Sequence, residues 1–216
     1  MNREDFEVLK TGIIYFDNAA TTLKPIILLY VSNKGKTNLP LYRSYKVPFA
    51  SIPNYYSANA HRGDYSLSVK VSSEYEKVRS LVKTFIGATN ESEIVFTSGC
   101  TDSLNKIIFG YFKNYLKKGD EVLITKTEHA ANVLPWFELE EQIGIKVKYI
   151  PLTEDHKVTM ENVEKSITGN TKVISLAHIT NVIGDLRPVK QITNYAHKNN
   201  ILVVVDGAQS IPHIKV

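Results

Sequence analysis

The chain has 216 residues, of which 43% are hydrophobic and 22% are charged. This length and composition allow one large domain or two small ones with a real core, and they exclude a wholly disordered chain. Cys100 is the single cysteine, which excludes a disulfide framework and a cysteine-rich zinc site. No apolar run approaches the roughly 20 residues of a transmembrane helix, and the N-terminus lacks the apolar segment of a secretory signal. We therefore expect a soluble, cytoplasmic protein.

The net charge of +4 is unevenly placed along the chain. Between Asn18 and Gly63 there are six basic residues and no acidic residue. Because these basic residues are sparse, the segment lacks the dense basic stripe of nucleic-acid-binding proteins, and we expect no nucleic-acid partner. Residues 26–54 show no helical or two-residue period, so we interpret them as an atypical loop or insert. This divides the chain into an N-terminal segment (1–25), the insert (26–54) and a main domain (55–216).

Helical and strand patterns alternate after the insert. The predicted helices are one that ends before Gly87, one through Leu104 to Tyr115, one at 160–168 with Thr159 as N-cap, and one from Pro188 to Lys198. The apolar face of the first is marked by Tyr75, Val78, Val82 and Phe85. The predicted strands are 93–97, 121–125, 146–150, 172–177 and 201–205. Apolar strands separated by helices are typical of a mainly parallel α/β sheet flanked by helices.

Ligands in such sheets bind beyond the carboxyl ends of the strands. The first such end, Ser98 to Thr101, leads into a helix and is either a phosphate cradle or a capped turn. His129 follows the next strand and is either functional or a structural histidine.

Two more strand ends carry polar groups. Asn181 either fixes a ligand hydroxyl or caps a turn, and Asp206 ends the most apolar strand. A carboxylate there needs a cationic partner, which is either a protonated pyridine nitrogen or a structural arginine. Phosphate donors, an imidazole, an amide and an anion at one edge together predict a pyridoxal 5'-phosphate site.

Six motifs in order support this interpretation, at 15–22, 58–63, 96–101, 128–136, 178–184 and 205–209. They resemble the class V aminotransferase fold, in the cysteine desulfurase and selenocysteine lyase branch of the sulfur-mobilisation type. The resemblance implies the large domain of a pyridoxal-phosphate-dependent transferase of fold type I, incomplete at the C-terminus. It also implies a homodimer that acts on L-cysteine or a related amino acid, with a sulfur-acceptor protein and a role in iron–sulfur cluster assembly.

The resemblance also implies roles for individual residues. Cys100 and Thr101 would hold the cofactor phosphate, and His129 would stack on the pyridine ring. His61 would lie near the substrate or the cofactor edge. The other implied contacts are the ring hydroxyl for Asn181 and Gln209, and the ring nitrogen for Asp206. Cys100 is not the family's catalytic thiol, and we expect it to be a small buried residue at a turn.

The family's Schiff-base lysine lies in a Ser/Thr-x-His-Lys motif beyond the Asp206 strand, and the chain stops at Val216 before reaching it. The persulfide-forming cysteine and the carboxylate-binding arginine of the family also lie beyond that point. We therefore expect the chain alone to be inactive. Another class V aminotransferase or lyase, a catalytically inactive remnant, and a plain nucleotide-binding α/β domain stay open as alternatives, the last without a recognised phosphate loop.

Overall fold

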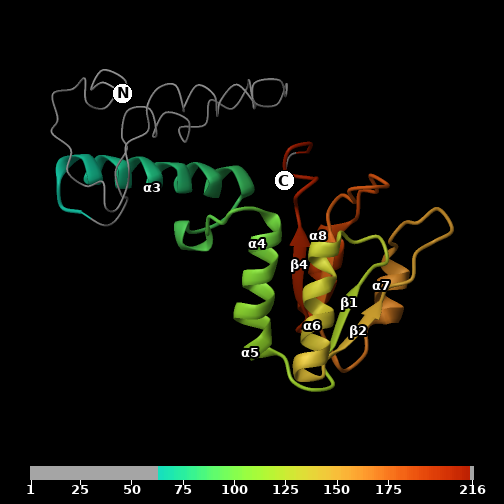
Figure 1. Ribbon diagram of the computed structural model, residues 1–216. Helices are drawn as coiled ribbons and strands as arrows, with labels where there is room; N and C mark the ends of the chain where they lie inside the picture. The colour runs from blue at the N-terminus through green and yellow to red at the C-terminus, as the bar shows by residue number, and fades with distance from the viewer. Residues whose placement is uncertain (1–62, 215–216) are drawn as a thin grey trace, which may run out of the picture. The chain divides into compact units, whose positions relative to one another are not determined.

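The computed structural model describes residues 63–214 (Figure 1). The chain divides into two compact units, residues 1–95 and 96–216. The predicted segments 1–25 and 26–54 lie outside the described residues, so the division at residue 54 stays a prediction. None of the helices between residues 63 and 214 combines the length and the apolarity needed to cross a bilayer.

The described part of the first unit is dominated by α3 (Ser66–Ile86). Its predicted end before Gly87 is confirmed: Gly87 has a φ of 71°, a left-handed conformation that suits glycine, and the next amide, of Ala88, donates to the Lys83 carbonyl at 2.9 Å. The buried apolar residues are Leu67, Val71 and Val78, whereas Phe85, predicted to lie on the apolar face, is exposed. The buried stripe therefore starts at Leu67, about two turns before its predicted start at Tyr75.

The predicted strand at 93–97 is wrong. The structure has a 3₁₀ turn, η4 (Glu91–Glu93), followed by a run without strand pairing, in which Val95 is 72% exposed. The composition of this run suits a strand, but a strand also needs a hydrogen-bonded neighbour. No strand among residues 63–214 pairs with it.

The second unit is built on a parallel sheet, as predicted. Its strands are β1 (Glu121–Ile124), β2 (Lys146–Tyr149), β3 (Thr171–Ala177) and β4 (Leu202–Asp206). Their order is β2-β1-β3-β4, and every neighbouring pair is parallel. All four carboxyl ends therefore lie at the same edge of the sheet.

The helices of this unit include one that the sequence did not predict. They are α4 (Cys100–Asn105), the π-helical turn η5 (Lys106–Phe112), α5 (Lys113–Tyr115), the 3₁₀ turn η6 (Ala130–Asn132), α6 (Leu134–Ile143), α7 (Met160–Ser166) and α8 (Val189–Lys198). The unpredicted one is α6, which has Pro135 in its first turn and ends at Gly144, with a φ of 74°. Thr159 caps α7 as predicted, because its hydroxyl accepts from the Asn162 amide at 3.2 Å.

Two apolar clusters pack against opposite faces of the sheet. One contains Val122 and Ile124 of β1, with side chains from the run 100–115 and from α6. The other contains Leu123 of β1, with side chains from α7 and α8. This alternation along β1 places helices on both faces, which explains why that strand is fully buried.

The two outer strands of the described sheet differ in chemistry. On β2, Lys146 and Lys148 supply charges, and Lys148 pairs with the buried Glu121 at 2.6 Å. On β4, Leu202 to Val205 are all apolar, and Val205 is 41% exposed. Lysines keep an edge strand from pairing with other chains, and β4 has none.

We therefore expect the chain to bind a hydrophobic dye and to aggregate through β4. Val205→Lys should lower dye fluorescence and light scattering, because a charge on an outer strand opposes edge-to-edge association. Tyr149→Lys on β2 is the matched control, since Tyr149 is equally exposed, at 41%, and its strand already carries lysines. A monomeric wild type with a cooperative melt and no dye binding would contradict this expectation.

Candidate functional site

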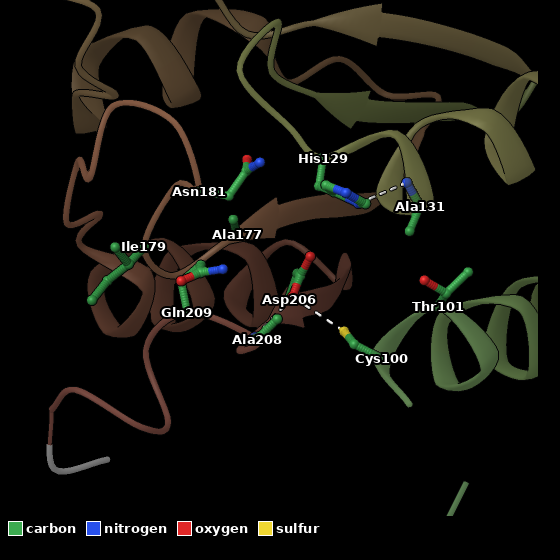
Figure 2. A pocket seen from close by; sticks show the side chains of 10 residues that line it. All are labelled: Cys100, Thr101, His129, Ala131, Ala177, Ile179, Asn181, Asp206, Ala208 and Gln209. Atoms are coloured by element: carbon green, nitrogen blue, oxygen red, sulfur yellow. Dashed lines mark hydrogen bonds between the residues drawn. The ribbon is translucent and has the colours of Figure 1, made fainter. Parts of the chain in front are cut away.

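A pocket lies at the carboxyl ends of the parallel strands (Figure 2). It contains six of the seven residues predicted from the sequence as site residues: Cys100, Thr101, His129, Asn181, Asp206 and Gln209. Ala131, Ala177, Ile179 and Ala208 complete the lining. The seventh predicted residue, His61, lies outside the described residues. The roles of all seven stay predictions, but the structure brings six of them into one cavity.

The pocket begins at the first turn of α4. The amides of Cys100 and Thr101 donate no hydrogen bond within residues 63–214, as expected at the start of a helix. Asp102, in the same turn, is directed away from the lining, because its carboxylate accepts from the Ser98 amide at 3.0 Å. The turn thus offers two free amides and the Thr101 hydroxyl to an anion.

His129 follows β1 and occupies the N-cap position of η6. Its Nδ1 accepts from the Ala131 amide at 3.1 Å. In the neutral ring the proton therefore sits on Nε2. This hydrogen bond fixes the imidazole at the wall of the pocket and leaves Nε2 free for a ligand.

Asn181 and Gln209 come from the loops after β3 and β4. Asn181 lies on a tight hairpin, in which Ile179 and Leu186 form an antiparallel bridge and Gly184 adopts a φ of 75°. Gln209 lies in the turn that follows Asp206. Neither amide side chain has a hydrogen-bond partner between residues 63 and 214, so both are available to a ligand.

Asp206 ends β4 and is 6% exposed. Both hydrogen bonds to its carboxylate reach Oδ1, from the Cys100 thiol at 3.3 Å and from the Ala208 amide at 2.9 Å. Within the described chain Oδ2 has no partner, and the carboxylate forms no ion pair. Figure 2 shows Asp206 beside the cavity between His129 and Gln209. A cationic ligand atom would complete its coordination.

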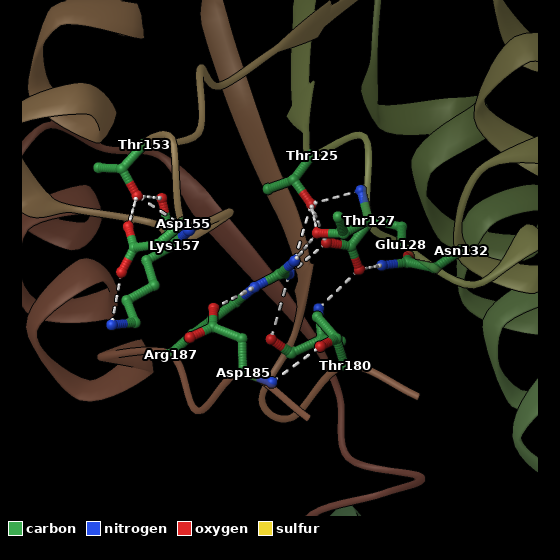
Figure 3. Close-up of polar contacts among 11 residues, drawn as sticks. Thr125, Thr127, Glu128, Asn132, Thr153, Asp155, Lys157, Thr180, Asp185 and Arg187 are labelled. Atoms are coloured by element: carbon green, nitrogen blue, oxygen red, sulfur yellow. Dashed lines mark hydrogen bonds and ion pairs between the residues drawn. The ribbon is translucent and has the colours of Figure 1, made fainter. Parts of the chain in front are cut away.

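The structural arginine considered for Asp206 is used elsewhere. Arg187 is buried, with 2% exposure, and it pairs with Glu128 (Figure 3). Neither side chain of this pair has any solvent exposure. Asp185 lies 3.8 Å from the Arg187 Nε and adds a second, longer ion pair. The alternative of an arginine partner for Asp206 is therefore wrong for the residues that the structure describes.

The Glu128–Arg187 pair joins the ends of two strands. Glu128 Oε2 accepts from the Ala177 amide at the end of β3, at 2.7 Å. Arg187 Nη2 donates to the hydroxyls of Thr125 and Thr127, just after β1, at 2.8 and 2.7 Å. The positions of His129 and of the Asn181 hairpin therefore depend on one buried network.

Asn132 extends this network into the core. Its Nδ2 donates to Glu128 Oε2 at 3.0 Å, and its Oδ1 accepts from the Ser175 hydroxyl at 2.5 Å. Asn132 follows His129 by three positions, and Ser175 lies on β3, the strand next to β1.

Roles for Glu128, Ser175 and Arg187 were not predicted from the sequence. A charged residue directly before Pro188 and an acidic residue directly before His129 were the available signals.

The expectation that Cys100 is a buried residue is wrong. Cys100 is exposed to the pocket, and its thiol points to Asp206. Partial burial, the hydrogen bond to Asp206 and the negative charge of that carboxylate raise the pKa of the Cys100 thiol to about 11. The thiol is therefore protonated at neutral pH and acts as a hydrogen-bond donor.

The parallel sheet, with a pocket at the carboxyl ends of its strands, defines an α/β protein with a ligand site at the usual place for such sheets. The profile of the aminotransferase class-V family matches residues 49–216. The chain belongs to this family, whose members use pyridoxal 5'-phosphate.

Relatives of the chain carry one name repeatedly. A probable cysteine desulfurase of Borreliella burgdorferi is 39% identical over 99% of this chain and 48% of its own length. One of Halalkalibacterium halodurans is 35% identical over 98% and 48%. The chain spans about half the length of the curated relatives it matches.

Solved structures of cysteine desulfurases are also similar to this chain. An apo cysteine desulfurase from Thermococcus onnurineus NA1 is similar with a TM-score of 0.70 and 32% identity, over 99% of this chain and 48% of that one. The cysteine desulfurase CsdA of Escherichia coli is similar with a TM-score of 0.66 and 28% identity, over 99% and 49%. The predicted fold class and family resemblance are therefore confirmed.

Arg187→Met should lower the free energy of unfolding by about 3–5 kcal/mol, because it leaves the Glu128 carboxylate buried without a cation. Denaturant unfolding of the full chain measures this loss. Adding Glu128→Gln should recover part of it by removing the unpaired charge. Lys165→Met, in the exposed Glu161–Lys165 pair, is the matched control and should change little. A loss for Arg187→Met no larger than that of the control would refute the structural role of the pair.

Proposed function

We propose that this chain binds pyridoxal 5'-phosphate and forms the cofactor-binding part of a cysteine desulfurase. One observation carries the proposal: the start of α4 and the segments after β1, β3 and β4 bring free amides, an imidazole, two amide side chains and an unpaired carboxylate oxygen into a single pocket. These groups match the phosphate, the ring face, the ring hydroxyl and the ring nitrogen of this cofactor. The names of the relatives support the desulfurase assignment.

The donor set fits the cofactor at both of its charged ends. The free amides of Cys100 and Thr101 suit a phosphate, which is stabilised at the start of a helix. At the other end, the buried Asp206 has an oxygen without a partner among residues 63–214, and a protonated pyridine nitrogen would pair with it. Asn181 and Gln209 have free amides for the ring hydroxyl. The phosphate, the ring nitrogen and the ring hydroxyl of the cofactor thus each have a complementary group in the pocket.

Bound pyridoxal 5'-phosphate supplies an electron sink for bond changes at an amino acid's α-carbon. Asp206 maintains the sink, because its negative charge favours the protonated ring nitrogen. His129 holds the ring in place, and its Nε2 is the atom able to accept or give a proton, since Nδ1 is occupied by the Ala131 amide. Ala131, Ala177, Ile179 and Ala208 supply small apolar surface that limits water around the ring.

The proposed substrate is L-cysteine. In the overall reaction L-cysteine and an enzyme thiol give L-alanine and an enzyme persulfide, whose outer sulfur then passes to an acceptor protein. The raised pKa of the Cys100 thiol argues against this residue as the nucleophile, because the thiolate is the reactive form. No lysine lines the pocket in the described chain. We therefore assign the persulfide cysteine and the Schiff-base lysine to the half of the relatives that this chain does not match.

The proposal includes a cytoplasmic homodimer that provides sulfur for iron–sulfur cluster assembly. These features come from the family resemblance. The alternative of another class V aminotransferase or lyase predicts products other than alanine and an enzyme persulfide from the complete enzyme. The alternative of an inactive binding module predicts cofactor binding without turnover.

We expect the 216-residue chain to bind pyridoxal 5'-phosphate without turning over L-cysteine. Asp206→Ala should weaken binding at least tenfold, because Asp206 is the one acidic side chain among residues 63–214 that lines the pocket, and the protonated ring nitrogen loses it. Calorimetry and cofactor absorbance measure the affinity. Asp155→Asn is the matched control, since Asp155 is an exposed carboxylate that does not line this pocket, and should leave affinity unchanged. Equal binding by wild type and Asp206→Ala, or no binding by wild type, would contradict the proposal.

A further inference from the structure

The side chain of Cys100 makes a contact that has no part in the proposed phosphate binding. Only the backbone amide of Cys100 would contact the phosphate, whereas its thiol donates to Asp206 Oδ1 at 3.3 Å, across 106 positions of the chain. Figure 2 shows this contact between the start of α4 and the end of β4. It is the link between the side of the pocket that suits the phosphate and the side that suits the ring nitrogen.

The Asp206 carboxylate is held asymmetrically. The Cys100 thiol, 106 positions before Asp206, and the Ala208 amide, two positions after it, both donate to Oδ1. Oδ2 receives no hydrogen bond from any residue between 63 and 214, although Asp206 is only 6% exposed. Two donors on one oxygen restrict rotation of the carboxylate and direct the other oxygen into the pocket.

The geometry points to Cys100 as a positioning residue: its thiol fixes Asp206 Oδ1 so that Oδ2 faces the nitrogen of a bound pyridinium ring. This inference rests on the proposed function. It assigns to Cys100 a role in the charge state of the ring, beyond the phosphate contact of its amide.

A thiol suits this role because it is a weak, neutral donor. An arginine or lysine in its place would neutralise Asp206 and compete with the ring nitrogen, whereas a thiol leaves the negative charge available. Asp206 in turn affects Cys100: together with burial, the hydrogen bond to Asp206 and its negative charge raise the pKa of the thiol to about 11. The thiol is therefore the protonated partner at neutral pH, and it donates its hydrogen to Asp206.

The contact can be tested without a cofactor. Cys100 is the single cysteine of the chain, so the rate of alkylation by iodoacetamide, followed by mass spectrometry, reports on this thiol alone. Asp206→Asn should speed alkylation of the apo chain at pH 8 by about threefold or more, because the thiolate is the reactive form and loses a repelling charge. An unchanged rate would overturn the contact.

The positioning role is tested by pyridoxal 5'-phosphate affinity measured from pH 6 to 9. The wild type should bind more tightly at low pH, and its affinity should fall as pH rises past the ring-nitrogen pKa of the free cofactor, because the protonated ring is preferred. Cys100→Ala should bind about three- to tenfold more weakly at low pH and show a smaller fall. Cys100→Ser, which retains a donor, should restore both properties.

Thr101→Ala is the matched control. It removes a hydroxyl expected to contact the phosphate, so it should weaken binding without reducing the fall across this pH range. A Cys100→Ala profile that matches the wild type, or that shifts like the control, would overturn the positioning role and leave the proposed function standing. If the wild type binds no cofactor, the proposed function fails and the role toward the ring fails with it, while the alkylation rates still decide the Cys100–Asp206 contact.

Discussion

The buried ion pair between Glu128 and Arg187 is the interaction on which the geometry of the pocket depends. Neither side chain has any solvent exposure, so each charge is tolerable only because the other is beside it. Their remaining hydrogen-bonding atoms reach the threonines after β1 and the main chain at the end of β3. Loops at strand ends are ordinarily variable, but here a charged network below the pocket fixes two of them relative to the sheet.

The network and the pocket share a boundary at the Glu128–His129 peptide. Glu128 is directed into the sheet, and His129 is directed to the ligand side, where the Ala131 amide orients its ring. On the neighbouring strand, Ala177 contacts Glu128 through its amide and also lines the pocket. Structure and chemistry are thus assigned to adjacent residues, which explains why the motif around His129 contains both an acidic residue and an asparagine.

Much of the sheet and most of the candidate site could be predicted from the sequence. Strands β1, β3 and β4 contain apolar runs, and β2 alternates lysines with apolar residues. The rule that parallel strands direct ligands to their carboxyl ends led to His129, Asn181 and Asp206. Helix α6 was not predicted, although Pro135 in its first turn and Gly144 after its end are ordinary residues at helix boundaries. The run at 93–97 was wrongly predicted as a strand because composition does not reveal whether a pairing partner exists. Pairings such as Glu128 with Arg187, 59 positions apart, depend on tertiary geometry and have no local pattern.

Asp206 belongs both to the sheet and to the pocket, because it ends β4 and lines the site. It ends β4, whose other residues are all apolar, and it is buried without a cation among the described residues. Burial of this carboxylate without a cation is unfavourable in the apo chain. A bound cation would remove that cost, so part of the free energy of ligand binding would come from Asp206.

The most direct test is the ¹⁵N resonance of ring-labelled pyridoxal 5'-phosphate bound to the chain, measured at a pH above the ring-nitrogen pKa of the free cofactor. We expect a pyridinium resonance for the bound ring, because Asp206 keeps the nitrogen protonated at that pH. A bound cofactor whose nitrogen resonates as a neutral pyridine would contradict the account.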